Sequence, residues 1–173
     1  MIGFFITLMF LFQADAPSLP GTPGESGVWL LQNGAWIKMI SAPFAGVNAK
    51  GLDNYIYTGG YTNLGMDVSF AGSMADLRIS DREPIFTARL DDGDYEPVLV
   101  RLEKKKDRRL CRSKLSSAST DNKHGFRKKD IMRTVLTVNT DKSFTVRPER
   151  PLKPGEYLLV IGSPSFGRDF GVD

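Results

Sequence analysis

The stretch Leu152-Lys153-Pro154-Gly155-Glu156-Tyr157-Leu158-Leu159-Val160-Ile161 places a Pro-Gly turn and one glutamate before five apolar or aromatic residues. Pro154 fixes φ for the first turn position, and Gly155 tolerates the positive φ that the second position can require. An unbroken apolar run of this length is typical of a strand that is buried on both faces. The stretch therefore predicts a late core strand, and the fold class then depends on the pattern of the remaining chain.

Short strand patterns recur along the rest of the chain, and no sustained helical period follows the N-terminal apolar run. Asn33-Gly34 is a strong hairpin signal between apolar segments, because both residues tolerate the positive φ of a type I′ turn. Residues 131–138 read as a core strand, and residues 162–173 as a last edge strand. The pattern predicts an all-β fold, an antiparallel two-sheet sandwich of the immunoglobulin-like kind, with a partly open β-barrel as the alternative.

Tyr157 follows its turn in the manner of the tyrosine corner of immunoglobulin-like sandwiches. In that motif the phenol hydroxyl returns to a backbone group a few residues upstream. We therefore expect Tyr157 Oη to hydrogen-bond the backbone within several residues before it.

The N-terminal residues 1–16 have the features of a signal peptide. Ile2–Phe12 is apolar but shorter than the roughly 20 residues that a bilayer span needs, and Ala14-x-Ala16 fits a cleavage site. Residues 17–27 read as a Pro, Gly and Ser linker, and residues 28–173 as a single β-domain. The organisation predicts a secreted or periplasmic protein that does not span the membrane.

The positive charge of the chain is concentrated in residues 101–129, where twelve of 29 residues are Lys or Arg and three are acidic. Such a segment attracts polyanions. Export disfavours nucleic acid as the partner, as does the presence of a single aromatic residue, Phe126, in the segment. The alternative is a solvated hairpin whose charges keep an edge strand from pairing with other chains. The candidate polyanion-binding residues are Lys104, Lys105, Lys106, Arg108, Arg109, Arg112, Arg127, Lys128 and Lys129.

Aromatic side chains among Gly and Asn make residues 54–61 a second candidate binding loop. Flat rings beside amides suit a sugar surface, and Tyr55, Tyr57 and Tyr61 are the candidate carbohydrate-binding residues. An irregular connection with no ligand is the alternative.

Residues that would carry catalysis or bind a metal are sparse in this sequence. His124 is the sole histidine, Cys111 is the sole cysteine, and no Gly-x-Ser-x-Gly or phosphate-loop motif is present. Cys111 reads as a small apolar strand residue. The acidic turn at residues 91–96 reads as a soluble hairpin rather than a calcium loop. The sequence predicts no enzyme activity, no metal and no cofactor.

The chain resembles an uncharacterised family of bacterial exported β-domains, over roughly residues 27–173. The matching features are short segments, each built around a turn or a strand: Gly27–Leu31 with Gly34–Trp36, Pro84–Phe86, Leu99–Leu102, Lys106–Arg109, Leu152–Tyr157 and Asp169–Val172. The resemblance implies an exported β-rich domain with no assigned activity. We expect a non-catalytic domain that acts by surface contact in the envelope or extracellular space. The partner is unknown from the sequence, with a polysaccharide and an envelope protein as the candidates, and polyanion or carbohydrate binding is the alternative function.

Overall fold

The described part of the chain is built from strands, as expected. The computed structural model describes residues 20–51, 56–57, 64–89, 96–115, 125–162 and 164–173. Two 3₁₀ turns, η2 (Lys128–Asp130) and η3 (Pro164–Phe166), accompany the strands. Within these ranges no helix combines the length and the apolarity needed to cross a bilayer. The all-β class is confirmed.

The strands form three open sheets, which we name A, B and C. Sheet A runs in the order β11 (Thr134–Val138), β12 (Phe144–Pro148), β6 (Ile85–Arg89), β1 (Gly27–Gln32), β2 (Ala35–Lys38). Sheet B runs β3 (Phe44–Lys50), β4 (Leu64–Ala71), β9 (Arg108–Leu115), β8 (Glu103–Lys104). Sheet C runs β10 (Ile131–Met132), β7 (Val98–Arg101), β13 (Gly155–Val160), β14 (Arg168–Val172), β5 (Arg78–Ile79).

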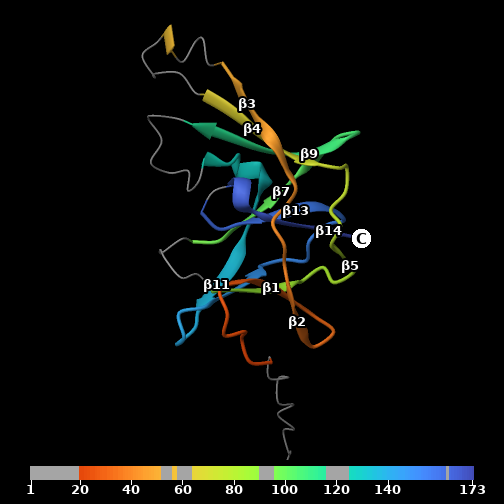
Figure 1. Ribbon diagram of the computed structural model, residues 1–173, viewed down its shortest axis with the longest axis vertical. Helices are drawn as coiled ribbons and strands as arrows, with labels where there is room; N and C mark the ends of the chain where they lie inside the picture. Colours follow the sequence, from red (N-terminus) through yellow and green to blue (C-terminus); the bar gives the residue numbers. More distant parts are fainter. Residues whose placement is uncertain (1–19, 52–55, 58–63, 90–95, 116–124, 163) are drawn as a thin grey trace, which may run out of the picture.

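Sheet C lies between the other two sheets and contributes to two separate hydrophobic cores (Figure 1). One core joins it to sheet A and includes Phe86 opposite Phe170, whose rings lie 5.1 Å apart. The other joins it to sheet B and includes Phe70 and Cys111. The described strands thus form three layers, where the sequence predicted two sheets.

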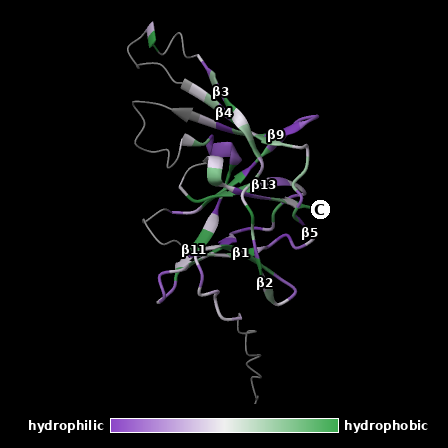
Figure 2. Ribbon diagram, in the orientation of Figure 1, coloured by the Kyte–Doolittle hydropathy of each residue, from purple (hydrophilic) through white to green (hydrophobic). Residues whose placement is uncertain are grey.

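The strand β13 explains the third layer. Tyr157 and Leu159 enter the core shared with sheet A, whereas Leu158 and Val160 enter the core shared with sheet B. All four are almost fully buried, which confirms the predicted strand with two apolar faces. A second sheet covers only one face of such a strand, so a third layer is required to remove the other face from water. Figure 2 colours the strands of these layers by the hydropathy of each residue, with hydrophobic residues in green.

The hydrogen bond predicted for Tyr157 is present at the start of β13. Tyr157 Oη donates a hydrogen bond to the carbonyl oxygen of Lys153 at 2.6 Å. The Tyr157 ring stacks on Phe170 with a centroid separation of 5.6 Å. Burial raises the pKa of the Tyr157 hydroxyl above its ordinary value, so the hydroxyl remains a donor. The hydrogen bond fixes the loop that enters β13.

The predicted Asn33-Gly34 turn is also confirmed, and a second hairpin joins β8 to β9. Asn33 and Gly34 have φ values of 52° and 77°, and they join β1 to β2 with Gln32 opposite Ala35. The chain reverses between β8 and β9 with Glu103 opposite Leu110, and Lys105 N donates to Arg108 O at 2.8 Å.

Two predicted strand positions were wrong. Residues 131–138 do not form one core strand, because the chain leaves sheet C after β10 and enters sheet A as β11. Strand β11 is an edge strand, and Val138 is 64% exposed. Conversely, β14 is not an edge strand but pairs with both β13 and β5, and Phe170 is fully buried.

Asp141 stabilises the turn between β11 and β12 and provides a pH-dependent prediction. Its carboxylate accepts hydrogen bonds from Ser143 N and Oγ at 3.1 and 2.6 Å and from Thr22 Oγ1 at 3.0 Å, and it pairs with Arg89. These contacts lower its pKa from 3.8 to about 2. A lowered folded-state pKa contributes stability that is present above the ordinary value and is lost as the pH falls toward about 2.

We therefore expect Asp141→Asn to destabilise the protein near neutral pH and to become equal to wild type at acidic pH. Thermal unfolding midpoints of both proteins across the interval from 3.8 to about 2 measure this convergence. Ser143→Ala, which removes one of the donors, should give a smaller effect of the same sign. A difference between Asp141→Asn and wild type that stays constant with pH would contradict the assignment.

Candidate anion-binding cleft

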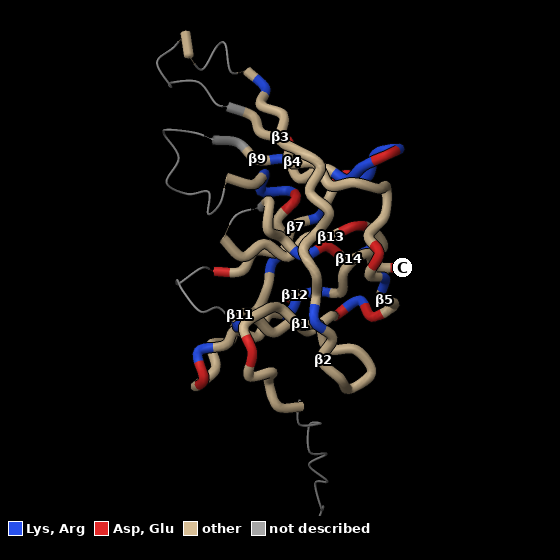
Figure 3. The backbone as a smooth tube through the Cα atoms, viewed as in Figure 1, with Lys and Arg blue, Asp and Glu red and all other residues tan. Residues whose placement is uncertain are grey.

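The lysines of the predicted basic segment lie on a projecting hairpin. Lys104 is in β8, and Lys105, Lys106 and Arg108 continue through the turn into β9, all of them exposed. The hairpin extends from the edge of sheet B, and Figure 3 shows its basic residues beside acidic ones. Lys105 pairs with Glu103, and Arg108 pairs with Asp107 at 3.1 Å. Part of the charge on this hairpin is therefore already neutralised.

Other cations of the basic segment are paired within the fold. Arg112 Nη2 lies 2.8 Å from Glu103 Oε2, and Arg127 Nη2 lies 2.6 Å from Asp130 Oδ2. Lys128 and Lys129 are exposed in η2. The nine candidate residues are thus divided between a hairpin, the interior and a short turn rather than gathered on one face.

Arg109 is a structural residue, because its side chain is only 1% exposed. Its Nη2 lies 2.5 Å from Asp169 Oδ2 and donates to Ala71 O at 3.0 Å, while its Nη1 lies 4.0 Å from Glu156 Oε2. Glu156 also accepts from Ala75 N and pairs with Arg78 at 2.5 Å. Arg109 therefore bridges sheets B and C, and a ligand at the surface does not reach it.

The structure describes only some of the other residues that the sequence singled out. Tyr57 is 92% exposed, whereas Tyr55 and Tyr61 lie outside the described residues, as do His124 and residues 91–95 of the acidic turn at 91–96. Cys111 is fully buried, and burial raises its pKa to about 12. This confirms that Cys111 is an apolar strand residue. The described residues contain no group of three or more His, Cys, Asp or Glu that could hold a metal ion.

A hollow of about 530 Å³ lies where sheets A and C meet. We call it the basic cleft. Four exposed cations line it: Arg101, Arg133, Arg150 and Lys153. Glu149 is the one carboxylate among the described lining residues. None of the four cations is in an ion pair with a described residue, in contrast to the paired cations elsewhere in the fold.

Three local features of the chain create this arrangement. Arg133 stands between β10 and β11, where the chain passes from sheet C to sheet A. Glu149 and Arg150 follow the end of β12, and Glu149 N donates to Arg133 O at 3.0 Å, which joins the two walls. Arg101 ends β7, opposite Tyr157 in the sheet. The cleft therefore forms where the chain changes sheets.

The floor and the walls of the cleft differ in polarity. Leu152 and Tyr157 are buried beneath it, and Met132 is half-buried. The Tyr157 hydroxyl anchors the backbone at Lys153, which fixes the wall that carries this lysine. Guanidinium groups offer planar pairs of donors that match carboxylate, phosphate and sulfate groups. The cleft can thus hold an anionic group over a partly apolar floor.

Sequence reasoning missed Arg133, Arg150 and Lys153 because they lie outside the basic segment. A signal was nevertheless present: residues 147–153 contain three cations and one acid around two prolines, in a segment without strand alternation. Arg101 belongs to the predicted segment but was not singled out.

Comparison with known proteins gives no relative for this chain. No protein-family model matches it, and no curated protein or solved structure has significant similarity to it. The resemblance to exported β-domains therefore stays a prediction.

Proposed function

We propose that this protein is a non-catalytic binding domain that holds a negatively charged ligand in the basic cleft. The observation that carries the proposal is the set of four exposed cations around one hollow, unpaired within the described residues. Cations that have carboxylate partners in the fold are already satisfied, whereas unpaired cations around a concavity attract anions from solution. The hollow of about 530 Å³ is within the size range of small-ligand sites.

The proposed location of the protein, outside the cytoplasm, rests on the sequence. Residues 1–16 support export, and an exported domain meets anionic groups on envelope and extracellular polymers. An immunoglobulin-like sandwich remains part of the same proposal, supported by the tyrosine corner at Tyr157.

Charge reversal inside and outside the cleft tests the proposal. The probe is a fluorescently labelled sulfated disaccharide at low salt, and the cleft variant combines Arg133→Glu, Arg150→Glu and Lys153→Glu. Because charge-assisted hydrogen bonds contribute about 1.5–3 kcal/mol each, we expect affinity to fall by about tenfold or more. Glu149→Gln should strengthen binding, because it removes the lining carboxylate.

The matched control changes the same number of charges at exposed lysines that do not line the cleft: Lys106→Glu, Lys129→Glu and Lys142→Glu. It should bind the probe within about twofold of wild type. A third variant, with Lys104, Lys105 and Lys106 changed to Glu, tests the hairpin. If the hairpin variant loses binding while the cleft variant retains it, the site is the hairpin and the proposal is wrong.

A further inference from the structure

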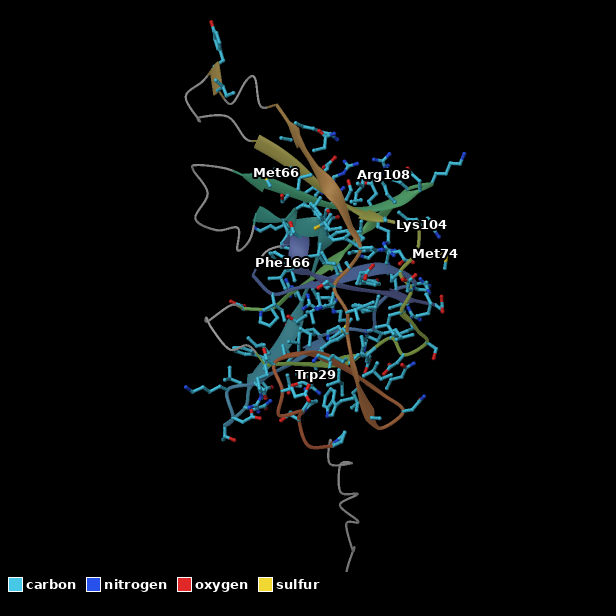
Figure 4. All side chains as sticks on the ribbon, in the orientation of Figure 1. Trp29, Met66, Met74, Lys104, Arg108 and Phe166 are labelled. Carbon is cyan, nitrogen blue, oxygen red and sulfur yellow. The ribbon has the colours of Figure 1, made fainter. Side chains whose placement is uncertain are left out.

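A second hollow of about 390 Å³ lies beside the basic cleft. Its lining includes Lys104 of the β8–β9 hairpin, Met74, Gly155 and Val172. Figure 4 shows Lys104 and Met74 on the same side of the fold. Arg101 lines both hollows, and the chain segment that lines the cleft at Lys153 continues directly into the second hollow at Pro154.

Arg101 is held at the junction of the two hollows. Its Nη2 donates to Pro154 O at 3.1 Å, and its guanidinium lies over Gly155. A Cβ at position 155 would lie 3.2 Å from Arg101 Nη2, so the absence of a side chain there lets the guanidinium rest on the backbone. One hydrogen bond leaves other N–H groups of Arg101 available to a ligand.

The cations that a ligand meets in the second hollow are Lys104 and Arg101. Arg78 and the carboxylates of Glu156 and Asp173 also line it, and Arg78 pairs with Glu156 at 2.5 Å and with Asp173. Lys104 has no ion-pair partner among the described residues. Unpaired cations thus stand in the second hollow, at the junction and in the cleft.

The linings also indicate which class of polyanion fits. Tyr157 is the one aromatic residue among the described residues that line either hollow, and it is 1% exposed. Single-stranded nucleic acids bind through accessible aromatic rings on which bases stack. A polymer recognised by repeated carboxylate or sulfate groups needs only spaced cations.

We propose that the two hollows form one continuous track for an extended acidic polysaccharide, with Arg101 contacting the chain as it passes from one hollow to the other. This inference rests on the proposed function of the basic cleft and adds the ligand class and the second contact site. It predicts that affinity depends on ligand length and that Lys104 contributes only when the ligand is long enough to reach it.

Calorimetric titration of the full chain with a length series of heparin oligosaccharides tests the track. Affinity should rise with length and level off once both hollows are filled. Lys104→Gln should weaken binding of the long oligosaccharides by about fivefold and leave the disaccharide unchanged. Arg101→Gln should weaken both. The control Lys106→Gln, on the same hairpin but outside both linings, should change neither.

The outcomes separate the two proposals. Equal affinity for the disaccharide and the long oligosaccharides would overturn the track while leaving the basic cleft intact. Failure of every oligosaccharide to bind would overturn both. A single-stranded oligonucleotide of matched charge that binds as tightly as the longest oligosaccharide would overturn the assignment of ligand class.

Discussion

Replacing Arg109 with leucine is expected to destabilise the protein by about 3–5 kcal/mol, the usual cost of removing one partner from a buried ion pair. Arg109 is 1% exposed and lies 2.5 Å from Asp169 across the boundary between sheets B and C. Leucine would leave Asp169 in the interior without its cation and would remove the hydrogen bond to Ala71 O. Urea denaturation monitored by intrinsic fluorescence measures the change.

Arg108→Leu is the matched control, because this neighbouring arginine is exposed and, among the described residues, forms an ion pair only with the adjacent Asp107. Its expected effect is within about 0.5 kcal/mol. Adding Asp169→Asn to Arg109→Leu should recover part of the loss, since the uncompensated charge is then removed. Equal effects at positions 108 and 109 would refute the structural role assigned to Arg109.

The loss at position 109 should also depend on pH. Burial raises the pKa of Asp169, and Arg109 opposes this shift. Without the arginine, the folded-state pKa of Asp169 should rise further. An acid with a raised folded-state pKa binds its proton more tightly when folded, so stability falls as the pH rises through that pKa. The destabilisation by Arg109→Leu should therefore be greatest near neutral pH and decrease on acidification.

The second large effect is expected at Leu158, on the other face of β13 from Tyr157. Leu158 is fully buried in the core between sheets B and C. Truncation to alanine should cost about 2–5 kcal/mol, from lost transfer free energy and from the cavity left behind. Leu136 on the edge strand β11 is 36% exposed and provides the control. Leu136→Ala should cost less than about 1 kcal/mol.

Gly167 offers an independent test of the packing around Leu158. A Cβ added at Gly167 would lie 2.7 Å from Leu158 Cγ and Cδ1. Gly167→Ala alone should therefore cost about 1–3 kcal/mol by overpacking. In the Leu158→Ala background the clash is absent, so the two substitutions should be non-additive by about 1 kcal/mol or more. Simple additivity would contradict the close approach of these residues.

Much of the fold was predictable because its strongest signals are local. The Asn33-Gly34 turn and the apolar run after Pro154 specify their own backbone geometry, and both are confirmed. The third sheet was not deduced, although a strand with two apolar faces requires cover on both. The division of residues 131–138 was missed because β-branched residues favour strands without specifying which sheet they join.

The basic cleft was harder to predict, because it forms where the chain passes from sheet C to sheet A. Charge density along the sequence pointed to residues 101–129, but the fold pairs or buries several of those cations. Arg133 is separated from Arg150 and Lys153 in the sequence by β11 and β12, and the three cations meet only when β10 and β12 lie in neighbouring sheets. The distribution of charge along the sequence does not show which cations lie close together in the folded protein.

A structure of the protein bound to a heparin oligosaccharide would show where the ligand lies. We predict sulfate or carboxylate oxygens at about 2.7–2.9 Å from the guanidinium groups that line the basic cleft, Arg133 and Arg150 among them. An oligosaccharide bound only to Lys105 and Lys106 at the tip of the hairpin, with the cleft empty, would contradict this prediction.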